Sequence, residues 1–160
     1  MNIIPKDYKE IRSQIDKGQL SCEKLVNLYL ENIEEQKDLN VFITIFETGS
    51  IERAKEIDRK IASGKAGKLA GAVFTIKDVI SVKDSLLTCG SKLLSNFDSI
   101  YNATVIERLL NEDAIIIGKV NCDEFAMGSS NENSYYGPVK NPVDRTSVPG
   151  GSSVACAVFV

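Results

Sequence analysis

Histidine and tryptophan are both absent from the 160 residues of this sequence. Without histidine, the chain can form neither a Ser-His-Asp triad nor a zinc site that has histidine ligands. Proton transfer near neutral pH must then use a carboxylate, or a lysine or cysteine whose titration is shifted by its surroundings. Any acid–base chemistry in this chain therefore depends on these three kinds of side chain.

Long apolar runs and closely spaced cysteines are absent as well. No stretch approaches the ~20 apolar residues that a membrane-spanning helix needs, and residues 1–7 lack the basic segment that opens a secretory signal. The four cysteines, at positions 22, 89, 122 and 156, are too far apart for a CxxC metal knuckle. We therefore expect a cytoplasmic protein with reduced thiols, no bound metal and no membrane association.

An excess of positive charge is also missing. The net charge is −3, and a content of 26% charged and 43% hydrophobic residues is ordinary for a globular domain. A surface that binds the phosphate backbone of a nucleic acid is usually basic. If the protein takes part in nucleic-acid chemistry, we therefore expect another chain to hold the nucleic acid.

Residues 1–64 are predicted to be mainly helical. Apolar residues recur at helical spacing, with Ser21 and Ser50 placed to cap two helices and Gly18 placed to end the first. The run 41–46 is rich in β-branched and aromatic residues and predicts a strand between these helices.

Residues 71–160 have the pattern of an α/β core. The apolar run 72–76 predicts a buried strand, and Asn102 is placed to cap a helix that carries apolar residues at 105–110. The run 114–118 is apolar on both faces, which is typical of a central strand. Strand, helix and strand in this order predict a parallel crossover.

The run 155–160 is apolar and has no capping residue. Natural C-termini are usually exposed and polar. We therefore expect the sequence to stop inside a buried element, so that residues 1–160 form the N-terminal part of a single domain.

Lys77 directly follows a predicted apolar strand. One interpretation is a lysine at the strand end that extends its amine into water. The other is a buried lysine whose charged form is disfavoured by desolvation, which leaves a neutral amine able to act as a base. The residues around Lys77 do not decide between the two.

Two segments rich in small residues follow. The segment 121–134 combines small residues and side-chain amides around a glycine, which suits either a loop that lines a polar pocket or a capped surface loop. Its Asp123 and Glu124 are sequence neighbours whose side chains should point apart, so we do not expect an acid–base pair. The segment Gly150-Gly151-Ser152-Ser153 allows close approach of the backbone to a substrate, although such a sequence is often only a linker.

Together these segments resemble the amidase-signature family. The pattern is Thr75-Ile76-Lys77-Asp78 followed by Gly150-Gly151-Ser152-Ser153. Further similar positions are Thr88-Cys89-Gly90-Ser91, Tyr101-Asn102-Ala103-Thr104-Val105, Ile117-Gly118-Lys119 and Asn141-Pro142. Within the family, the run 123–134 is similar to the A subunits of tRNA-dependent amidotransferases.

The resemblance implies an amidase-signature fold, in which helices flank a mixed sheet and a helical segment comes first. It also implies that Lys77 is a neutral catalytic base and that Ser152 is a catalytic serine that relays the proton. Gly150, Gly151 and Ser153 would support the loop. The peptide bond before Ser152 would be cis in the complete protein, and in residues 1–160 alone we expect it to relax to trans. Two further residues would contribute to the substrate pocket, namely Met127 and Ser129.

The resemblance further implies a glutamine-hydrolysing enzyme that supplies ammonia. Its partners would be B and C subunits in a heterotrimer. The complex would convert Glu-tRNA(Gln) into Gln-tRNA(Gln), with ATP and Mg used in the partner subunit, while this chain itself would bind no cofactor. In relatives the nucleophilic serine lies further along the chain than residue 160, so residues 1–160 alone are expected to be inactive.

Two alternatives remain open, together with one departure from the family pattern. The chain could belong to another amidase-signature hydrolase that acts on a small amide, or it could be a non-catalytic, truncated relic. Relatives usually have small residues after the two serines, whereas this chain has Val154-Ala155-Cys156. We therefore expect the bulk of Val154 to crowd the turn.

Overall fold

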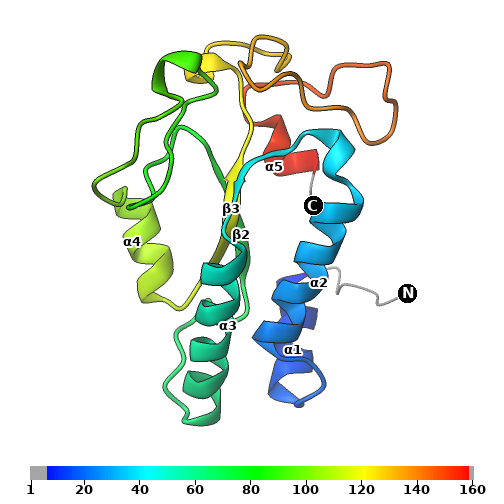
Figure 1. The fold of residues 1–160 in the computed structure, drawn as a ribbon. Coiled ribbons are helices and arrows are strands. Elements are labelled where there is room, and N and C mark those ends of the chain that lie inside the picture. Colours follow the sequence, from blue (N-terminus) through cyan, green and yellow to red (C-terminus); the bar gives the residue numbers. More distant parts are fainter. Residues whose placement is uncertain (1–6, 159–160) are drawn as a thin grey trace. The chain divides into compact units, whose positions relative to one another are not determined.

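The structure is a computed structural model, and it describes residues 7–158. Helices and strands alternate along the chain, which confirms the predicted α/β class (Figure 1). The helices are α1 (Tyr8–Asp16), α2 (Cys22–Glu35), α3 (Glu47–Ala62), α4 (Thr104–Asn111) and α5 (Val154–Val158). The strands are β1 (Phe42–Ile45), β2 (Val73–Lys77) and β3 (Ile115–Val120), and three short 3-10 helices are η1 (Lys37–Leu39), η2 (Lys92–Leu94) and η3 (Glu124–Ala126).

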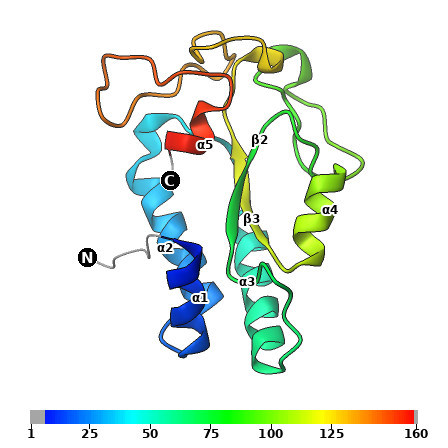
Figure 2. The same cartoon turned by 180° about the vertical axis from the view of Figure 1, so that it is seen from behind.

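The three strands form one mixed sheet in the order β1-β3-β2. Strand β1 is antiparallel to β3. Strands β2 and β3, which lie side by side in Figure 2, are parallel, because Ile115 N–H donates to Ala72 O and Asp78 N–H donates to Val120 O. Every residue of β3 is buried, as expected of a central strand. The predicted crossover from β2 through α4 to β3 is therefore confirmed.

The described chain divides into two compact units that alternate along the sequence. The first comprises the residues up to Glu35 with Phe46–Phe74 and Glu107–Ile117. The second comprises Gln36–Ile45, Thr75–Ile106 and the residues from Gly118 onward. All the residues that the sequence predicts for the site lie in the second unit.

The first unit has a core built from α1, α2 and α3. Its buried residues include Ile11, Ile15, Leu20, Cys22, Leu25, Val26, Ala54, Ile57, Ala70 and Ile115. Helix α2 begins as predicted, since the Ser21 hydroxyl accepts a hydrogen bond from Lys24 N–H at 3.1 Å. Asp58 of α3 accepts from the backbone N–H groups of Cys22 and Glu23 at 2.8 and 3.1 Å, so it satisfies two more donors at this helix end.

Two of the predicted helix caps are wrong. Helix α3 begins at Glu47, ahead of Ser50, whose buried hydroxyl donates to Glu47 O instead of accepting from a helix N–H. Helix α4 begins at Thr104, and the Asn102 side chain instead accepts from Lys83 N–H at 2.8 Å. Both residues belong to a type that caps helices, but each finds a different backbone partner nearby.

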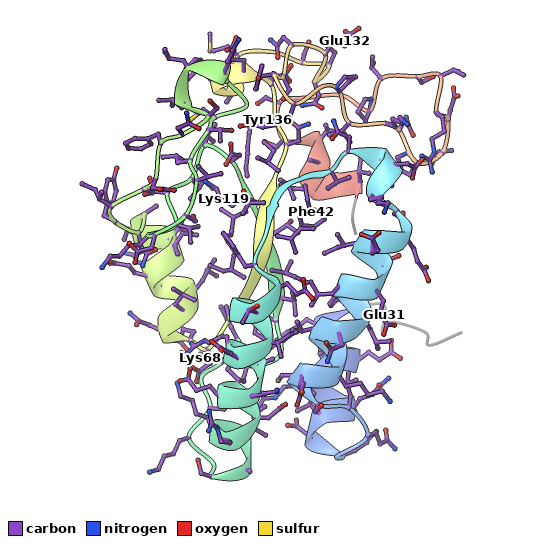
Figure 3. The ribbon with its side chains drawn as sticks, in the orientation of Figure 1. Glu31, Phe42, Lys68, Lys119, Glu132 and Tyr136 are labelled. Carbon is purple, nitrogen blue, oxygen red and sulfur yellow. The ribbon has the colours of Figure 1, made fainter. Side chains whose placement is uncertain are left out.

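The second unit has a smaller core beside β1 and α5. Its buried residues are Leu39, Val41, Val120, Val139 and Ala155, and Phe42, Val154, Cys156 and Val158 pack against them. Figure 3 shows Phe42 and Lys119 on opposite sides of the sheet. Phe42 packs against the core that contains Ala155 of α5, so α5, the helix that follows the two serines, packs on the side of the sheet where Phe42 lies.

Among residues 7–158, no helix has the length and apolar character required to cross a lipid bilayer.

Candidate active site

Lys77 is the last residue of β2, and its amine contacts two serine hydroxyls. Its Nζ donates to Ser152 Oγ at 2.7 Å and to Ser153 Oγ at 2.8 Å. The lysine is partly buried. Its amine therefore does not simply extend into water, and the structure brings together the lysine and the serine pair that the sequence singled out.

The two serines are held between a glycine turn and the start of α5. Gly150 has a φ of +100°, a conformation that favours glycine. The peptide bond between Gly151 and Ser152 is cis, so the expectation of a trans bond in residues 1–160 alone is wrong. Val154 begins α5 and packs against the core of the second unit. The expectation that Val154 crowds this turn is therefore wrong, because its side chain is directed into the core.

Asp78 follows Lys77 and forms a buried ion pair with Lys119. The two side chains are fully buried, and Lys119 Nζ lies 2.9 Å from Asp78 Oδ1. Lys119 also donates to Leu86 O at 2.7 Å. The other oxygen of Asp78 accepts from the Thr88 backbone N–H at 3.0 Å and from the Thr88 hydroxyl.

This ion pair was not predicted from the sequence. Lys119 lies in an otherwise apolar run, and such a lysine at a central strand needs a buried partner. A lysine within an apolar run is the sequence pattern that could have indicated a buried ion pair. The partner is Asp78, 41 positions earlier. Within residues 7–158 the Lys77 amine takes part in no ion pair, and Asp78 is paired with Lys119 instead.

The side chains of Asp123 and Glu124 point apart, as expected. Asp123 is buried, and its Oδ1 accepts from Asn131 N–H at 3.0 Å. Glu124 instead accepts from the Ser91 hydroxyl at 2.6 Å. The following residues include Phe125, Ala126 and Asn131 with φ between +50° and +63°, a left-handed conformation that is costly for residues other than glycine.

The two residues predicted for the substrate pocket are exposed. Met127 has 78% of its surface exposed. Ser129 is also exposed, but its backbone lies against Gly151: a Cβ atom placed on Gly151 would be 2.7 Å from Ser129 C. The structure therefore brings the Ser129 backbone to the serine loop, and it leaves the Met127 side chain free of the buried part of the site.

The thiols are poor candidates for the chemistry. All four cysteines are free. Burial raises the pKa of each thiol, to about 12 for Cys22 and about 11 for Cys122. A thiol is a nucleophile or base only as thiolate, so these cysteines are protonated at neutral pH. Of the three kinds of group that the lack of histidine leaves, lysine and carboxylate remain.

The described part of the chain has no group of three or more side chains arranged to hold a metal ion.

Comparison with known proteins agrees with this geometry. A model of the family described as "Amidase" matches residues 24–160. The chain belongs to the amidase family. This match spans β2, the loop before α5 and α5 itself, and so includes Lys77 and Ser152.

Similar proteins include the A subunits of an amidotransferase. The A subunit of glutamyl-tRNA(Gln) amidotransferase from Chlorobium phaeobacteroides (strain DSM 266) is 52% identical over 154 residues, which are 96% of this chain and 32% of that protein. The solved structure of the same subunit from Thermotoga maritima has a TM-score of 0.75 and 36% identity, covering 98% of this chain and 33% of that one. The chain thus spans about a third of the length of these relatives.

A solved amidase of another kind is similar in fold but less similar in sequence. The peptide amidase from Stenotrophomonas maltophilia has a TM-score of 0.89 and 27% identity, covering 97% of this chain and 34% of that one. The backbone is therefore common to amidases of different kinds, and the distinction between them lies in the side chains.

Proposed function

We propose that the protein acts as the glutamine-hydrolysing A subunit of a glutamyl-tRNA(Gln) amidotransferase. The observation that carries this proposal is the 52% identity to such a protein over 154 residues. The pairing of Lys77 with Ser152 supports it, because the 2.7 Å separation allows direct proton transfer between the two side chains.

In the proposed reaction, Lys77 is the base and Ser152 the proton relay. Neutral Lys77 accepts the hydroxyl proton of Ser152, and Ser152 accepts the proton of a nucleophilic serine located beyond residue 160. That serine attacks the side-chain carbonyl of glutamine, the C–N bond breaks, and ammonia leaves with the returned proton. Water then hydrolyses the glutamyl ester to glutamate and restores the serine.

The surroundings of Lys77 support its assignment as a base. Its amine contacts the Ser152 hydroxyl at 2.7 Å, and Asp78 is paired with Lys119 instead. Gly150, Gly151 and Ser153 are assigned to the loop that holds Ser152. Met127 and Ser129 are assigned to the substrate pocket of the complete protein, the latter because its backbone lies beside Gly151.

The proposed partners are the B and C subunits of the same enzyme. The A subunit would hand ammonia to the B subunit, which would use ATP and Mg to convert Glu-tRNA(Gln) into Gln-tRNA(Gln). We assign the tRNA to the complex and not to this chain alone, because the net charge of −3 gives the chain no basic excess.

The alternative is an amidase that acts on another small amide. The higher TM-score of the peptide amidase, 0.89 against 0.75 for the amidotransferase structure, favours it. The sequence identities, 27% against 36%, favour the amidotransferase. Backbone similarity is shared by amidases of different specificity, so we give the sequence identity more weight.

The complete polypeptide with its B and C subunits provides the test. We expect ammonia release from glutamine, and a higher kcat/KM for glutamine than for an aryl amide or a peptide amide. Formation of Gln-tRNA(Gln) from Glu-tRNA(Gln) should require ATP and Mg. A preference for the aryl or peptide amide, with no formation of Gln-tRNA(Gln), would replace this proposal by the alternative.

A further inference from the structure

Each carboxylate oxygen of Asp123 lies against a different glycine. A Cβ atom placed on Gly128 would be 2.2 Å from Asp123 Oδ1. A Cβ atom placed on Gly151 would be 2.1 Å from Asp123 Oδ2. At Gly128 no side chain larger than hydrogen fits unless Asp123 moves, and at Gly151 the backbone of residues 129 and 130 blocks a side chain as well. Asp123 thus fills the space between the loop around Gly128 and the loop that carries the two serines.

The hydrogen bonds of Asp123 account for only one of its oxygens. Oδ1 accepts from Asn131 N–H, whereas Oδ2 is buried and has no hydrogen-bond donor among residues 7–158. A buried polar atom without a partner is unfavourable. Hydrogen bonding alone therefore does not explain this second oxygen, but its contact with Gly151 gives it a steric role.

Gly151 connects the Asp123 carboxylate to Ser152, the proposed relay. It is joined directly to Ser152, whose Oγ lies 2.7 Å from Lys77 Nζ. On another side Gly151 meets the backbone of the loop 128–130, since its added Cβ would be 2.8 Å from Ser130 N. The position of Gly151 is therefore limited by the Asp123 carboxylate and by this backbone together.

We propose that Asp123 is a positioning residue, whose carboxylate holds Gly151 and thereby keeps the Ser152 hydroxyl at the Lys77 amine. Asp123 acts through the steric contact of its carboxylate with Gly151 and does not itself exchange a proton. The kinetic part of the proposal rests on the proposed function. The part that concerns the Lys77–Ser152 distance does not.

The first test compares Asp123→Ala with Asp123→Asn in the complete protein with its partner subunits. Alanine removes the carboxylate that contacts Gly151, which lets the Ser152 hydroxyl move. A misplacement of about 1 Å can lower a rate about 100-fold. We expect kcat for glutamine hydrolysis to fall by about this factor, with a smaller change in KM. Asparagine keeps the shape and the acceptor for Asn131 N–H, so it should retain kcat within about threefold.

The second test uses Gly128→Ala, whose new methyl group would collide only with Asp123 among its three nearest atoms. The collision should displace the carboxylate toward Gly151 and lower kcat. In an Asp123→Ala background the same change should have little further effect, because most of the colliding atoms are gone. Gly49→Ala in α3 is the matched control, as a Cβ there meets nothing within 4 Å.

Several outcomes would overturn the proposal. If Asp123→Asn loses as much kcat as Asp123→Ala, the charge matters and not the shape. If the effects of Gly128→Ala and Asp123→Ala multiply, Asp123 does not transmit the displacement. Should Asp123→Ala fail to fold, Asp123→Asn and Gly128→Ala decide, and thermal melting of each variant reports folding separately from kcat.

A crystal structure of the Gly128→Ala variant separates this proposal from the proposed function. We expect a longer Lys77 Nζ–Ser152 Oγ distance than in the unaltered protein. An unchanged distance contradicts the positioning role even if no glutamine is hydrolysed. A longer distance in a protein that does not hydrolyse glutamine would sustain the positioning role and remove the proposed function.

Discussion

Lys77, Ser152 and Ser153 come together although the serines are far from the lysine in sequence. The end of a buried strand and the run of two glycines and two serines each suggested a functional site. Their proximity followed only from the family resemblance, because no local rule predicts a contact over 75 positions. The partner of Asp78 could not be predicted for the same reason. Buried charges pair with residues that are distant in sequence, and the sequence does not show which residue of opposite charge is the partner.

Ser152 and Ser153 both accept from the same amine, so their substitution separates their roles. General acid–base catalysis contributes about 10²- to 10⁴-fold. We expect Ser152→Ala in the complete protein to lower kcat for glutamine by at least about 100-fold in an ammonia-release assay. Ser153→Ala, which removes a contact of similar length at 2.8 Å, is the matched control and should have a much smaller effect. A larger loss in Ser153→Ala would assign the relay to Ser153, and an equal loss would contradict a distinct role for Ser152.

Lys119 should be essential for stability. Lys119→Met removes the cation and leaves the Asp78 carboxylate buried without its ion-pair partner. Breaking a buried pair in this way costs about 3–5 kcal/mol, which urea unfolding of the complete protein would measure. Lys83→Met, at an exposed position, should change the free energy of unfolding by less than about 0.5 kcal/mol. Similar values for the two variants would mean that Asp78 is stabilised by its other hydrogen bonds alone.

The helices and strands were predicted with different success at their centres and at their ends. Apolar periodicity located α1, α2 and β3, because burial of one face or of both faces leaves a pattern in the sequence. The starts of α3 and α4 were misplaced. A serine or an asparagine can bond to several backbone groups. Ser50 donates to Glu47 O in its own helix, whereas Asn102 accepts from Lys83 N–H, which is distant in sequence.

Helix α2 should depend on a cap supplied by α3. Asp58→Ala leaves Cys22 N–H and Glu23 N–H without their acceptor. We expect a loss of about 1 kcal/mol in the free energy of unfolding. Glu52→Ala, at an exposed position of the same helix α3, is the control and should have almost no effect. Equal destabilisation by the two substitutions would indicate that Asp58 contributes no specific cap.

Asp113 should make the stability of the first unit depend on acid. Burial alone would raise its pKa, but hydrogen bonds from Lys60 and Gly67 N–H and the charge of Arg53 lower it below its usual value. The stabilisation is therefore fully present above the unfolded pKa of about 4. It is lost as the pH falls through the lower folded pKa. Urea unfolding as a function of pH should show this loss, and the Asp113→Asn variant should lack it.

The two compact units divide the chain in a way that composition and periodicity could not predict. Boundaries fall inside β2, α4 and β3, and others lie at the ends of α2 and β1, so each unit draws on distant parts of the sequence. The second unit also carries every large apolar side chain that is exposed among residues 7–158. These residues are Ile45, Leu93, Phe97, Ile100, Tyr101, Val105, Phe125, Met127, Tyr135, Val143 and Val148.

Residues 1–160 expressed alone should release no ammonia from glutamine. They contain the proposed base and relay, but the resemblance places the nucleophilic serine further along the chain, so no acyl-enzyme can form. The measurement is ammonia release above a blank without protein, with circular dichroism to establish that the polypeptide is folded. Turnover by the folded polypeptide would mean that a nucleophile within these residues suffices.

The most direct measurement is the rate of ammonia release from glutamine by the complete protein and its Lys77→Met variant, each assembled with its partner subunits. Methionine keeps an unbranched apolar side chain and removes the amine that contacts Ser152 at 2.7 Å. We predict that kcat falls by at least about 100-fold, while the melting temperature of Lys77→Met stays close to that of the unaltered protein. The control Lys140→Met, at an exposed lysine, should keep the kcat of the unaltered protein. Near-normal turnover by a folded Lys77→Met variant would contradict the proposed role of Lys77.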